Sequence, residues 1–418
     1  MQYKIKAPSC LKSEIKLPAS KSIGNRALVI SALAGGEITP YNLSDCDDTA
    51  VMVSALRDMP YEIDVKAAGT AMRFMTAYLA ATPGEHVITG TERMRHRPIA
   101  VLVDALRSLG ACIEYIGEEG YPPLRIVGRQ LYGRRLDISG NISSQFISAI
   151  LMIAPTLSGE LELHLTGEIF SRPYIDLTLW MMREFGADAE WTDIDTIVVK
   201  NVPYRPTSYY IENDWSAASY WYEMMALSGG EDDEIVLDGL LDGSKQGDSV
   251  VRYIFSLLGV KTVFEPSTLK GMSRVRLRNT GRCVPRLEYD FVSAPDLAQT
   301  FVATCLAKNV HFSFTGLKTL KIKETDRIEA LKSEARKLGY VIRDVDNSQL
   351  IWDGERCDPS PHVVIDTYED HRMALAFAPL AYVHPSLRIN QPQVVTKSYP
   401  HFWEHLVSCG FEISQSLS

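Results

Sequence analysis

Long apolar segments are missing from this 418-residue sequence. The longest apolar stretch, near Ala149 to Ala154, is far too short to cross a bilayer. The N-terminus alternates apolar and charged residues, as a strand does, and has no apolar core of the kind that signal peptides contain. Low-complexity tracts are missing too, while a hydrophobic content of 46% is enough for a large buried core. We therefore expect a globular cytoplasmic protein of more than one domain, with no membrane as partner.

Cysteine pairs and histidine clusters are also lacking. The seven cysteines are an odd number at unrelated spacings and form no CxxC pair, which argues against a disulfide framework. His401 and His405 are four residues apart in HFWEH, a spacing that places two metal ligands on one helix face. Because no third ligand is apparent, we interpret both as ordinary helix residues. The sequence thus predicts neither a metal site nor another cofactor.

Positive charge is in short supply. Lysine and arginine number 43 against 52 acidic residues, a formal net charge of -9. This balance disfavours nucleic acid and acidic membranes as partners, because both are negatively charged and bind to positively charged protein surfaces. The glycine-rich motifs of P-loops and of dinucleotide-binding turns are missing, and GSKQGDS around Lys245 is interpreted as a turn. An acidic chain can still bind small anions where its few cations are concentrated.

A repeat of helix endings is present instead. The endings LRSLGA, MREFGA, FSLLGV, ARKLGY and LVSCGF each join the last turn of an amphipathic helix, a glycine and an apolar residue that starts a strand. The glycines are Gly110, Gly186, Gly259, Gly339 and Gly410, at intervals of 76, 73, 80 and 71 residues. A sixth ending, ALRDMPY, stops at Pro60, only 50 residues before the first glycine. Six repeating units are therefore predicted, the first of them shortened.

Each unit also has an earlier helix and several short β-rich segments. The earlier helices are predicted to start near Ser22, Thr70, Ser143, Trp215, Pro295 and His371. We predict an α/β fold with two lobes of three units each, divided near Asn213–Asp214. The N-terminal lobe is expected to comprise residues 20–213. The C-terminal lobe is expected to comprise residues 214–418 together with the N-terminal strand in residues 1–19.

Several of these helices begin with an unusual combination of residues. Hydroxyls, glycine and cations occur together at helix starts around Lys21, Gly69, Ser143 and Arg372, and again around Lys323 and Arg327. A cation in a first turn opposes the helix dipole, at a cost of about 0.3–1 kcal/mol. Free N–H groups, close backbone approach and countercharge are, however, what an anion site needs. One such start is explained equally well by surface composition, but five at matching points of a repeat predict anion binding.

Nine motifs make the prediction more specific. LPASKSIGNRAL, AGTAMR, RMRHRPI, ISSQF, SRPYID, PDLAQT, KETDR, EDHRMA and TKSYP occur in this order from Leu17 to Pro400. The set resembles the 5-enolpyruvylshikimate-3-phosphate synthase family of the shikimate pathway. The resemblance implies an inside-out α/β barrel of three βαβαββ units per lobe, with the active site in the cleft between the lobes. It also implies transfer of the enolpyruvyl group of phosphoenolpyruvate to the 5-hydroxyl of shikimate 3-phosphate, through a tetrahedral adduct and without a metal.

The resemblance further implies roles for individual residues. Shikimate 3-phosphate would be held by Lys21, Ser22, Arg26, Ser143, Ser144, Gln145, Ser171, Tyr174, Asp296, Thr319 and Lys323. Phosphoenolpyruvate would be held by Lys21, Gly69, Arg97, Gln145, Arg327, Arg372 and Lys397. Asp296 matches the family's base and Glu324 its second acid–base group, with Lys21 close to the reacting carbon.

Each acid–base assignment has a plainer alternative. Taken alone, Asp296 is a helix N-cap and Glu324 a first-turn carboxylate. His371 donates to a phosphate or merely caps its helix, and the sequence does not decide which group protonates the methylene carbon.

The chain departs from the family at three positions near the site. Ala67 and Thr319 replace usual asparagines, and Phe74 replaces a usual proline. A threonine hydroxyl still donates one hydrogen bond, so we expect a modest loss of shikimate 3-phosphate affinity. Gly69 is retained, which predicts sensitivity to the family's inhibitor glyphosate.

The sequence argues against three other functions. A phosphate-binding structural module would explain the helix starts but not the acid–base pair. A UDP-N-acetylglucosamine enolpyruvyl transferase is disfavoured, because the catalytic-loop cysteine of that family would be expected near TERMRHRP and no cysteine occurs there. A non-catalytic anion-binding relative is disfavoured because Asp296, Glu324 and Lys21 are all retained. We expect a monomer with these small molecules as its only partners.

Overall fold

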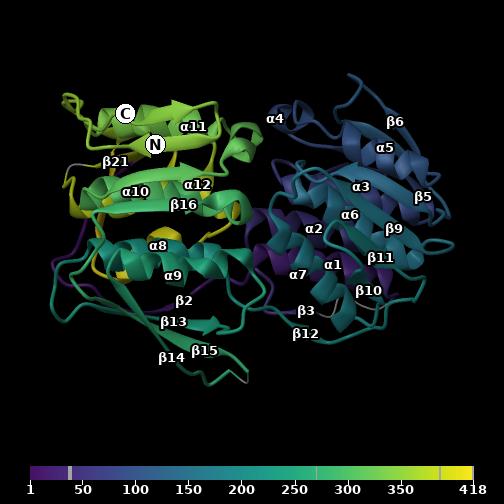
Figure 1. Cartoon of the computed structure of the whole chain (residues 1–418), viewed down its shortest axis with the longest axis horizontal. Coiled ribbons are helices and arrows are strands. Elements are labelled where there is room, and N and C mark those ends of the chain that lie inside the picture. Colours follow the sequence, from purple (N-terminus) through teal and green to yellow (C-terminus); the bar gives the residue numbers. More distant parts are fainter. Residues whose placement is uncertain (36–39, 270, 386, 417–418) are drawn as a thin grey trace. The chain divides into compact units, whose positions relative to one another are not determined.

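The computed structural model describes residues 1–35, 40–269, 271–385 and 387–416. The chain forms two compact units, which we call the N-lobe (Ala19–Ile211) and the C-lobe (Met1–Pro18 with Glu212–Ser418). Figure 1 shows both units, with the two chain termini in the C-lobe.

Among the described residues, five four-stranded sheets share one arrangement of strands. In four of them the first two strands of the sequence pair in parallel, and the last strand lies antiparallel between the second and the third. In the fifth, β20 and β21 pair in parallel, and the N-terminal strand β1 takes the antiparallel place between β21 and β22. The N-lobe has two such sheets, β4–β5–β7–β6 and β8–β9–β11–β10, and a two-stranded sheet. Their strands are β3 Pro40–Tyr41, β4 Glu62–Asp64, β5 Gly84–Thr89, β6 Cys112–Tyr115, β7 Leu124–Gly128, β8 Arg135–Ser139, β9 Leu161–Thr166, β10 Ala189–Trp191, β11 Thr196–Val199 and β12 Tyr209–Tyr210.

The C-lobe has the other three sheets, and the N-terminal segment completes two of them. Strand β1 lies between β21 and β22, and β2 pairs with β13 in parallel. The strands of this lobe are β1 Gln2–Lys6, β2 Lys12–Lys16, β13 Glu234–Leu240, β14 Val260–Pro266, β15 Ser273–Asn279, β16 Arg286–Asp290, β17 His311–Thr315, β18 Arg343–Val345, β19 Gln349–Trp352, β20 Val364–Ile365, β21 Arg388–Asn390 and β22 Glu412–Ser416.

Three helices in each lobe are buried on nearly every face, because their sequences are apolar all round. In the N-lobe these are α1 Lys21–Leu33, α3 Gly69–Ala81 and α6 Ser144–Ile153, which contact one another. In the C-lobe they are α8 Trp215–Leu227, α10 Ala298–Lys308 and α12 His371–Phe377 (Figure 1). The remaining helices are α2 Asp47–Asp58, α4 Glu92–Arg95, α5 Ala100–Ser108, α7 Arg172–Glu184, α9 Val251–Leu257, α11 Arg327–Lys337 and α13 Phe402–Ser408.

This arrangement, with helices at the centre and sheets outside, confirms the predicted inside-out α/β fold. In the described part of the chain, no helix has both the length and the apolarity needed to span a membrane.

The predicted helix boundaries are largely confirmed. All five repeat glycines have a positive φ, between 88° and 101°, as the left-handed position after a helix requires. Before Pro60 the same position is taken by Met59, with a φ of 40°. The observed first residues of the six earlier helices agree with prediction to within one residue, except that a 3-10 turn, Pro295–Leu297, precedes α10.

One predicted helix start is wrong. Lys323 and Glu324 were expected to open a helix, but α11 begins at Arg327. The reason is Asp326, whose carboxylate accepts a hydrogen bond from the Glu329 N–H at 3.2 Å and so caps the helix. Lys323 and Glu324 therefore lie in the bend between the 3-10 turn Lys318–Ile322 and α11, where their side chains are not constrained by a helix.

Candidate active site

The predicted site residues divide between the lobes, and each lobe brings its own set together. The N-lobe set lies at the starts of α1, α3, α6 and α7. Ser20 caps α1, and the adjacent Lys21 ammonium makes an ion pair with Asp48 at 3.0 Å. Ser22 lies in the first turn, with its hydroxyl 3.2 Å from that of Ser20.

Arg26 is the centre of the N-lobe set. Its guanidinium is buried and donates to the Thr178 hydroxyl at 2.7 Å, the Ser22 carbonyl at 2.8 Å and the Ser148 hydroxyl at 3.2 Å. None of the ion pairs found among the described residues includes Arg26. Burial lowers the pKa of Arg26 to about 10, so the side chain remains charged at neutral pH. A buried positive charge that only neutral oxygens solvate is suited to an anion.

Phe74, where the family usually has proline, supports this arginine. Its ring is fully buried in α3, and its centroid lies 5.3 Å from the Arg26 guanidinium carbon. This is a cation–π distance. The substitution therefore leaves the charged group in place and gives it an aromatic neighbour.

The start of α6 carries three predicted residues, one of which contacts the start of α3. Ser143 caps α6, accepting from the Gln145 N–H at 3.4 Å. The Gln145 amide donates to the Thr70 hydroxyl in the first turn of α3 at 3.1 Å. Ser144 is buried at the first position of α6. These groups supply hydroxyls and N–H donors without added charge.

The start of α7 adds two predicted residues. Ser171, just before the helix, has a φ of 54°, a left-handed conformation uncommon for serine. The Tyr174 ring lies 6.0 Å from the Arg26 guanidinium carbon, and the Tyr174 carbonyl accepts from Arg26 at 3.4 Å. Arg26 thus connects α1, α6 and α7.

Gly69 and Arg97 are in close contact. A Cβ atom added to Gly69 would lie 2.7 Å from Arg97 Nη1, so the absence of a side chain lets the guanidinium approach the start of α3. The buried Arg97 Nε has no hydrogen-bond partner among the described residues. The Gly69 carbonyl also accepts from Arg73, a second buried arginine, at 3.1 Å.

The C-lobe set is a dense cluster of opposite charges around Arg327. This guanidinium is fully buried and reaches three carboxylates: Asp370 at 2.6 Å, Asp296 at 2.8 Å and Glu324 at 2.9 Å. Its pKa is raised, because these carboxylates outweigh the opposing effect of burial. Asp370 was not among the predicted site residues. It also caps α12, because its carboxylate accepts a hydrogen bond from the Arg372 N–H at 2.9 Å.

Three further predicted cations complete the cluster. Arg372 donates to the Asp296 carboxylate at 3.3 Å, Lys323 lies 3.5 Å from it, and Lys397 donates to Glu324 at 3.0 Å. Four cations therefore face three carboxylates. The remaining positive charge and the partly exposed Lys323 side chain can receive an anion.

Asp296 does not cap a helix but is the centre of this cluster. Burial tends to raise the pKa of this carboxyl, but Lys323, Arg372 and Arg327 together hold it well below its usual range. The group is therefore ionised at neutral pH and can accept a proton. Nearby Asp248 behaves differently, because burial raises its pKa to about 6.

Thr319 completes the predicted residues of the C-lobe. It lies in the 3-10 turn Lys318–Ile322, just before Lys323. Its hydroxyl oxygen is buried and has no hydrogen-bond partner in the described part of the chain. A buried hydroxyl without a protein partner is available to a ligand.

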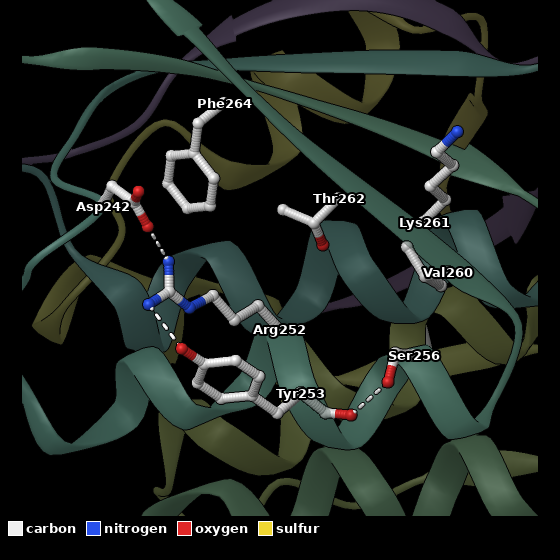
Figure 2. Close-up of a pocket in the computed structure, with 8 residues that line it drawn as sticks. All are labelled: Asp242, Arg252, Tyr253, Ser256, Val260, Lys261, Thr262 and Phe264. Atoms are coloured by element: carbon white, nitrogen blue, oxygen red, sulfur yellow. Dashed lines mark hydrogen bonds and ion pairs between the residues drawn. The ribbon is translucent and has the colours of Figure 1, made fainter.

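A separate surface cavity of about 420 Å³ lies in the C-lobe between α9 and β14 (Figure 2). None of the predicted site residues lines it. Its arginine, Arg252, is already engaged, because it pairs with Asp242 and donates to the Tyr253 hydroxyl at 2.8 Å. Its guanidinium carbon also lies 5.0 Å from the centroid of the Phe264 ring. We interpret this feature as structural.

Comparison with known proteins assigns the family. The model of the EPSP synthase (3-phosphoshikimate 1-carboxyvinyltransferase) family matches residues 5–64 and 59–406. A 3-phosphoshikimate 1-carboxyvinyltransferase of Bacteroides fragilis is 57% identical over 413 residues, covering 99% of each chain. The enzyme of the same description from Sulfurovum sp. is 34% identical over 426 residues, covering 95% of this chain and 96% of that one.

Solved structures show the same fold at lower identity. EPSP synthase from Acinetobacter baumannii has a TM-score of 0.78 at 23% identity, covering 99% of this chain and 100% of that chain. The enolpyruvyl transferase NikO from Streptomyces tendae has a TM-score of 0.72 at 14% identity, covering 99% and 98%. The chain therefore belongs to the EPSP synthase family, and its activity is that of a 3-phosphoshikimate 1-carboxyvinyltransferase of the shikimate pathway.

Proposed function

We propose that the N-lobe helix starts and the C-lobe charge cluster bind the substrates of this transfer, shikimate 3-phosphate and phosphoenolpyruvate. The observation behind the proposal is the chemistry of the two sets. The N-lobe contributes the buried charge of Arg26 with hydroxyl and amide donors. The C-lobe contributes four cations held against three carboxylates.

Shikimate 3-phosphate is assigned mainly to the N-lobe. Its binding residues there are Lys21, Ser22, Arg26, Ser143, Ser144, Gln145, Ser171 and Tyr174. Asp296, Thr319 and Lys323 of the C-lobe complete its set. Short hydroxyl and amide donors suit a ligand with several hydroxyl groups, while Arg26 and the helix starts suit its anionic groups.

Phosphoenolpyruvate is assigned to cations of both lobes. Lys21, Gly69, Arg97 and Gln145 lie in the N-lobe, and Arg327, Arg372 and Lys397 in the C-lobe. The arginine fork binds two oxygens of a carboxylate or a phosphate at once. Because the two substrates together bring two phosphates and two carboxylates, fixed cations are needed to offset their mutual repulsion.

The reaction needs a base and an acid. Asp296 takes the proton of the 5-hydroxyl as that oxygen attacks C2 of phosphoenolpyruvate, while Glu324 or Lys21 supplies a proton to the methylene carbon. The resulting tetrahedral adduct then loses phosphate from C2 and a proton from the neighbouring methyl carbon, which forms the carbon–carbon double bond of the enol ether. The products are 5-enolpyruvylshikimate 3-phosphate and inorganic phosphate.

Substrate binding also adjusts the base. In the protein alone, surrounding cations hold the pKa of Asp296 well below its usual range, which makes the carboxylate a weak base. Anions bound to Arg327, Arg372 and Lys323 counter the field of these cations. The pKa of Asp296 then rises toward the range that proton transfer requires.

Phosphate release tests the proposal directly. We expect release only when shikimate 3-phosphate and phosphoenolpyruvate are both present, with no change when a metal chelator is added. Each substrate alone, and UDP-N-acetylglucosamine as acceptor, serve as controls. No release with both substrates at saturating concentration contradicts the proposal, and release with the nucleotide sugar favours the related transferase. The cytoplasmic location and the monomeric state stay predictions from the sequence.

A further inference from the structure

A tight turn directly precedes the charged start of α12. The Asp370 N–H donates to the Thr367 carbonyl at 2.8 Å, and the two residues between them, Tyr368 and Glu369, have φ values of 53° and 57°. Positive φ at both central positions is the signature of a type I′ turn, which strongly favours glycine, asparagine and aspartate. Tyrosine and glutamate do not favour this conformation on their own.

A second turn in the same lobe offers a contrast. Between β18 and β19, Asp346 and Asn347 have φ values of 53° and 52°. These residue types tolerate the left-handed region, so that turn needs no outside support. The turn at Tyr368 and Glu369 must instead be held by contacts from elsewhere in the fold.

The support comes from Glu334, a fully buried carboxylate on α11. Its Oε1 accepts from the Tyr368 hydroxyl at 2.5 Å, and its Oε2 accepts from the Asp366 N–H at 3.1 Å. Lys337 contacts the same carboxylate at 2.8 Å and donates to the Asp366 side chain at 2.8 Å. The buried Glu334 carboxylate thus holds the chain at two points, the backbone of Asp366 just before the turn and the side chain of Tyr368 within it.

The same helix also holds the far end of the turn. Arg327, two turns before Glu334 on α11, pairs with Asp370 through two hydrogen bonds of 2.6 and 3.2 Å. Residues seven apart share one helix face, so a single face of α11 contacts residues 366 to 370 at both ends. Arg372 follows two residues later, and its side chain donates to Asp296.

We propose that Glu334 and Tyr368 are positioning residues for phosphoenolpyruvate. By holding the turn in its unfavourable conformation, they fix Asp370 and therefore the orientation of Arg327 and Arg372. This inference rests on the proposed function, which assigns these two arginines to phosphoenolpyruvate. Neither positioning residue contacts the reacting atoms.

Tyr368→Phe tests the inference, because it removes one hydroxyl and keeps the ring. We expect the KM for phosphoenolpyruvate to rise about fivefold to tenfold, the effect of losing one hydrogen bond to a buried carboxylate. kcat and the KM for shikimate 3-phosphate should stay within about twofold of wild type. Glu334→Gln, which disturbs the same contacts from the other side, should show the same pattern.

A matched control and a rescue separate positioning from general stability. The hydroxyl of Tyr382, also in the C-lobe, is buried without a hydrogen-bond partner among the described residues, so Tyr382→Phe should leave both KM values unchanged. Asparagine favours positive φ, so adding Glu369→Asn to Tyr368→Phe should lower the KM for phosphoenolpyruvate again.

Three outcomes overturn the inference while the wild type is active. The first is an unchanged KM for phosphoenolpyruvate in Tyr368→Phe and Glu334→Gln, and the second is an equal rise in both KM values. The third is a raised KM that Glu369→Asn fails to lower. A wild-type protein that releases no phosphate contradicts the proposed function instead, so the two failures are distinguishable.

Discussion

The two lobes prepare for anions in opposite ways. In the N-lobe, neutral hydroxyls and amides line the helix starts, and Arg26 is buried among oxygens that bear no charge. In the C-lobe, Arg327 already has three carboxylate partners, and Lys323, Arg372 and Lys397 add to the same cluster.

The difference has an energetic consequence. A buried cation without a counter-ion is costly until an anion arrives, so binding at Arg26 supplies a charge that the fold lacks. The C-lobe cations are already paired with Asp370, Asp296 and Glu324, which offset most of their charge, so an anion there has to compete with these carboxylates. Under the proposed function, we expect the C-lobe cluster to contribute to stability and catalysis together, and the N-lobe set to contribute mainly to binding.

Asp296→Asn should produce the largest effect. Removing the proposed base should lower kcat by a factor of about 10²–10⁴, the usual contribution of general base catalysis. Both substrates should still bind, as measured by calorimetry, because the amide keeps the size of the carboxylate. The exposed Asp232, changed to Asn, is the control and should remain fully active. A kcat within about threefold of wild type would remove Asp296 from the mechanism.

Arg327 and Arg26 should differ in their contribution to folding. Arg327→Met leaves the buried Asp370 and the partly buried Asp296 and Glu324 without their shared cation, which should lower the free energy of unfolding by about 3–5 kcal/mol. Arg26→Met leaves only neutral acceptors, so a loss of at most about 1–3 kcal/mol is expected. Urea unfolding of both variants measures the difference. Equal losses would show that the two arginines contribute equally to stability, despite their charged partners in one lobe and neutral partners in the other.

Asp248 gives the cluster a pH dependence. Its folded-state pKa of about 6 lies above the usual value, so the folded protein binds this proton more tightly than the unfolded chain does. The contribution of Asp248 to the free energy of unfolding should therefore fall as pH rises from about 4 to 6, by up to about 3 kcal/mol, and stay level above that pH. Asp248→Asn removes this loss and keeps an acceptor for the Ser216 hydroxyl.

The measurement is the difference between Asp248→Asn and wild type in urea unfolding at several pH values. The advantage of the variant should grow between about pH 4 and 6 and then remain constant. Asp232→Asn should show no such trend. An advantage that shrinks with rising pH would contradict the assigned pKa direction.

Local signals in the sequence were sufficient for much of the fold. The glycine at each helix end requires a positive φ that other residues avoid, so Gly110 and its four counterparts marked the repeat without any tertiary information. Four of the six buried helices, α1, α3, α6 and α12, were also visible in the sequence, because their starts are rich in hydroxyls, glycine or cations. The resemblance to the family, rather than these signals, supplied the roles of individual residues.

Tertiary contacts account for what the sequence did not predict. Asp296 and Asp370 are 31 and 43 residues away from Arg327, so no local pattern pairs them. The cap at Asp326 competed successfully with the earlier start expected at Lys323. The turn at Tyr368 lacks the usual turn residues and depends on Glu334, 34 residues earlier.

Gly69→Ala should have a moderate effect confined to binding. The new Cβ would lie 2.7 Å from Arg97 Nη1, so the guanidinium has to move away from the start of α3. The KM for phosphoenolpyruvate should rise about tenfold, equivalent to about 1.4 kcal/mol. Gly24→Ala, where the nearest atom would be Leu43 Cδ2 at 3.6 Å, is the control and should have no effect on KM. An unchanged KM in Gly69→Ala would remove Arg97 from the phosphoenolpyruvate set.

Thr319→Asn should have the smallest effect, and in the opposite direction. The Thr319 hydroxyl is buried without a protein partner among the described residues, as expected of a group that donates to a ligand. An asparagine amide has two donor hydrogens where the hydroxyl has one, so one more hydrogen bond to the phosphate of shikimate 3-phosphate becomes available. The KM for that substrate should fall about threefold, and the KM for phosphoenolpyruvate should not change. The asparagine amide would be a neutral donor in a lobe that otherwise depends on charge. A KM for shikimate 3-phosphate that rises in Thr319→Asn would therefore mean that the C-lobe contacts this substrate through its cations alone.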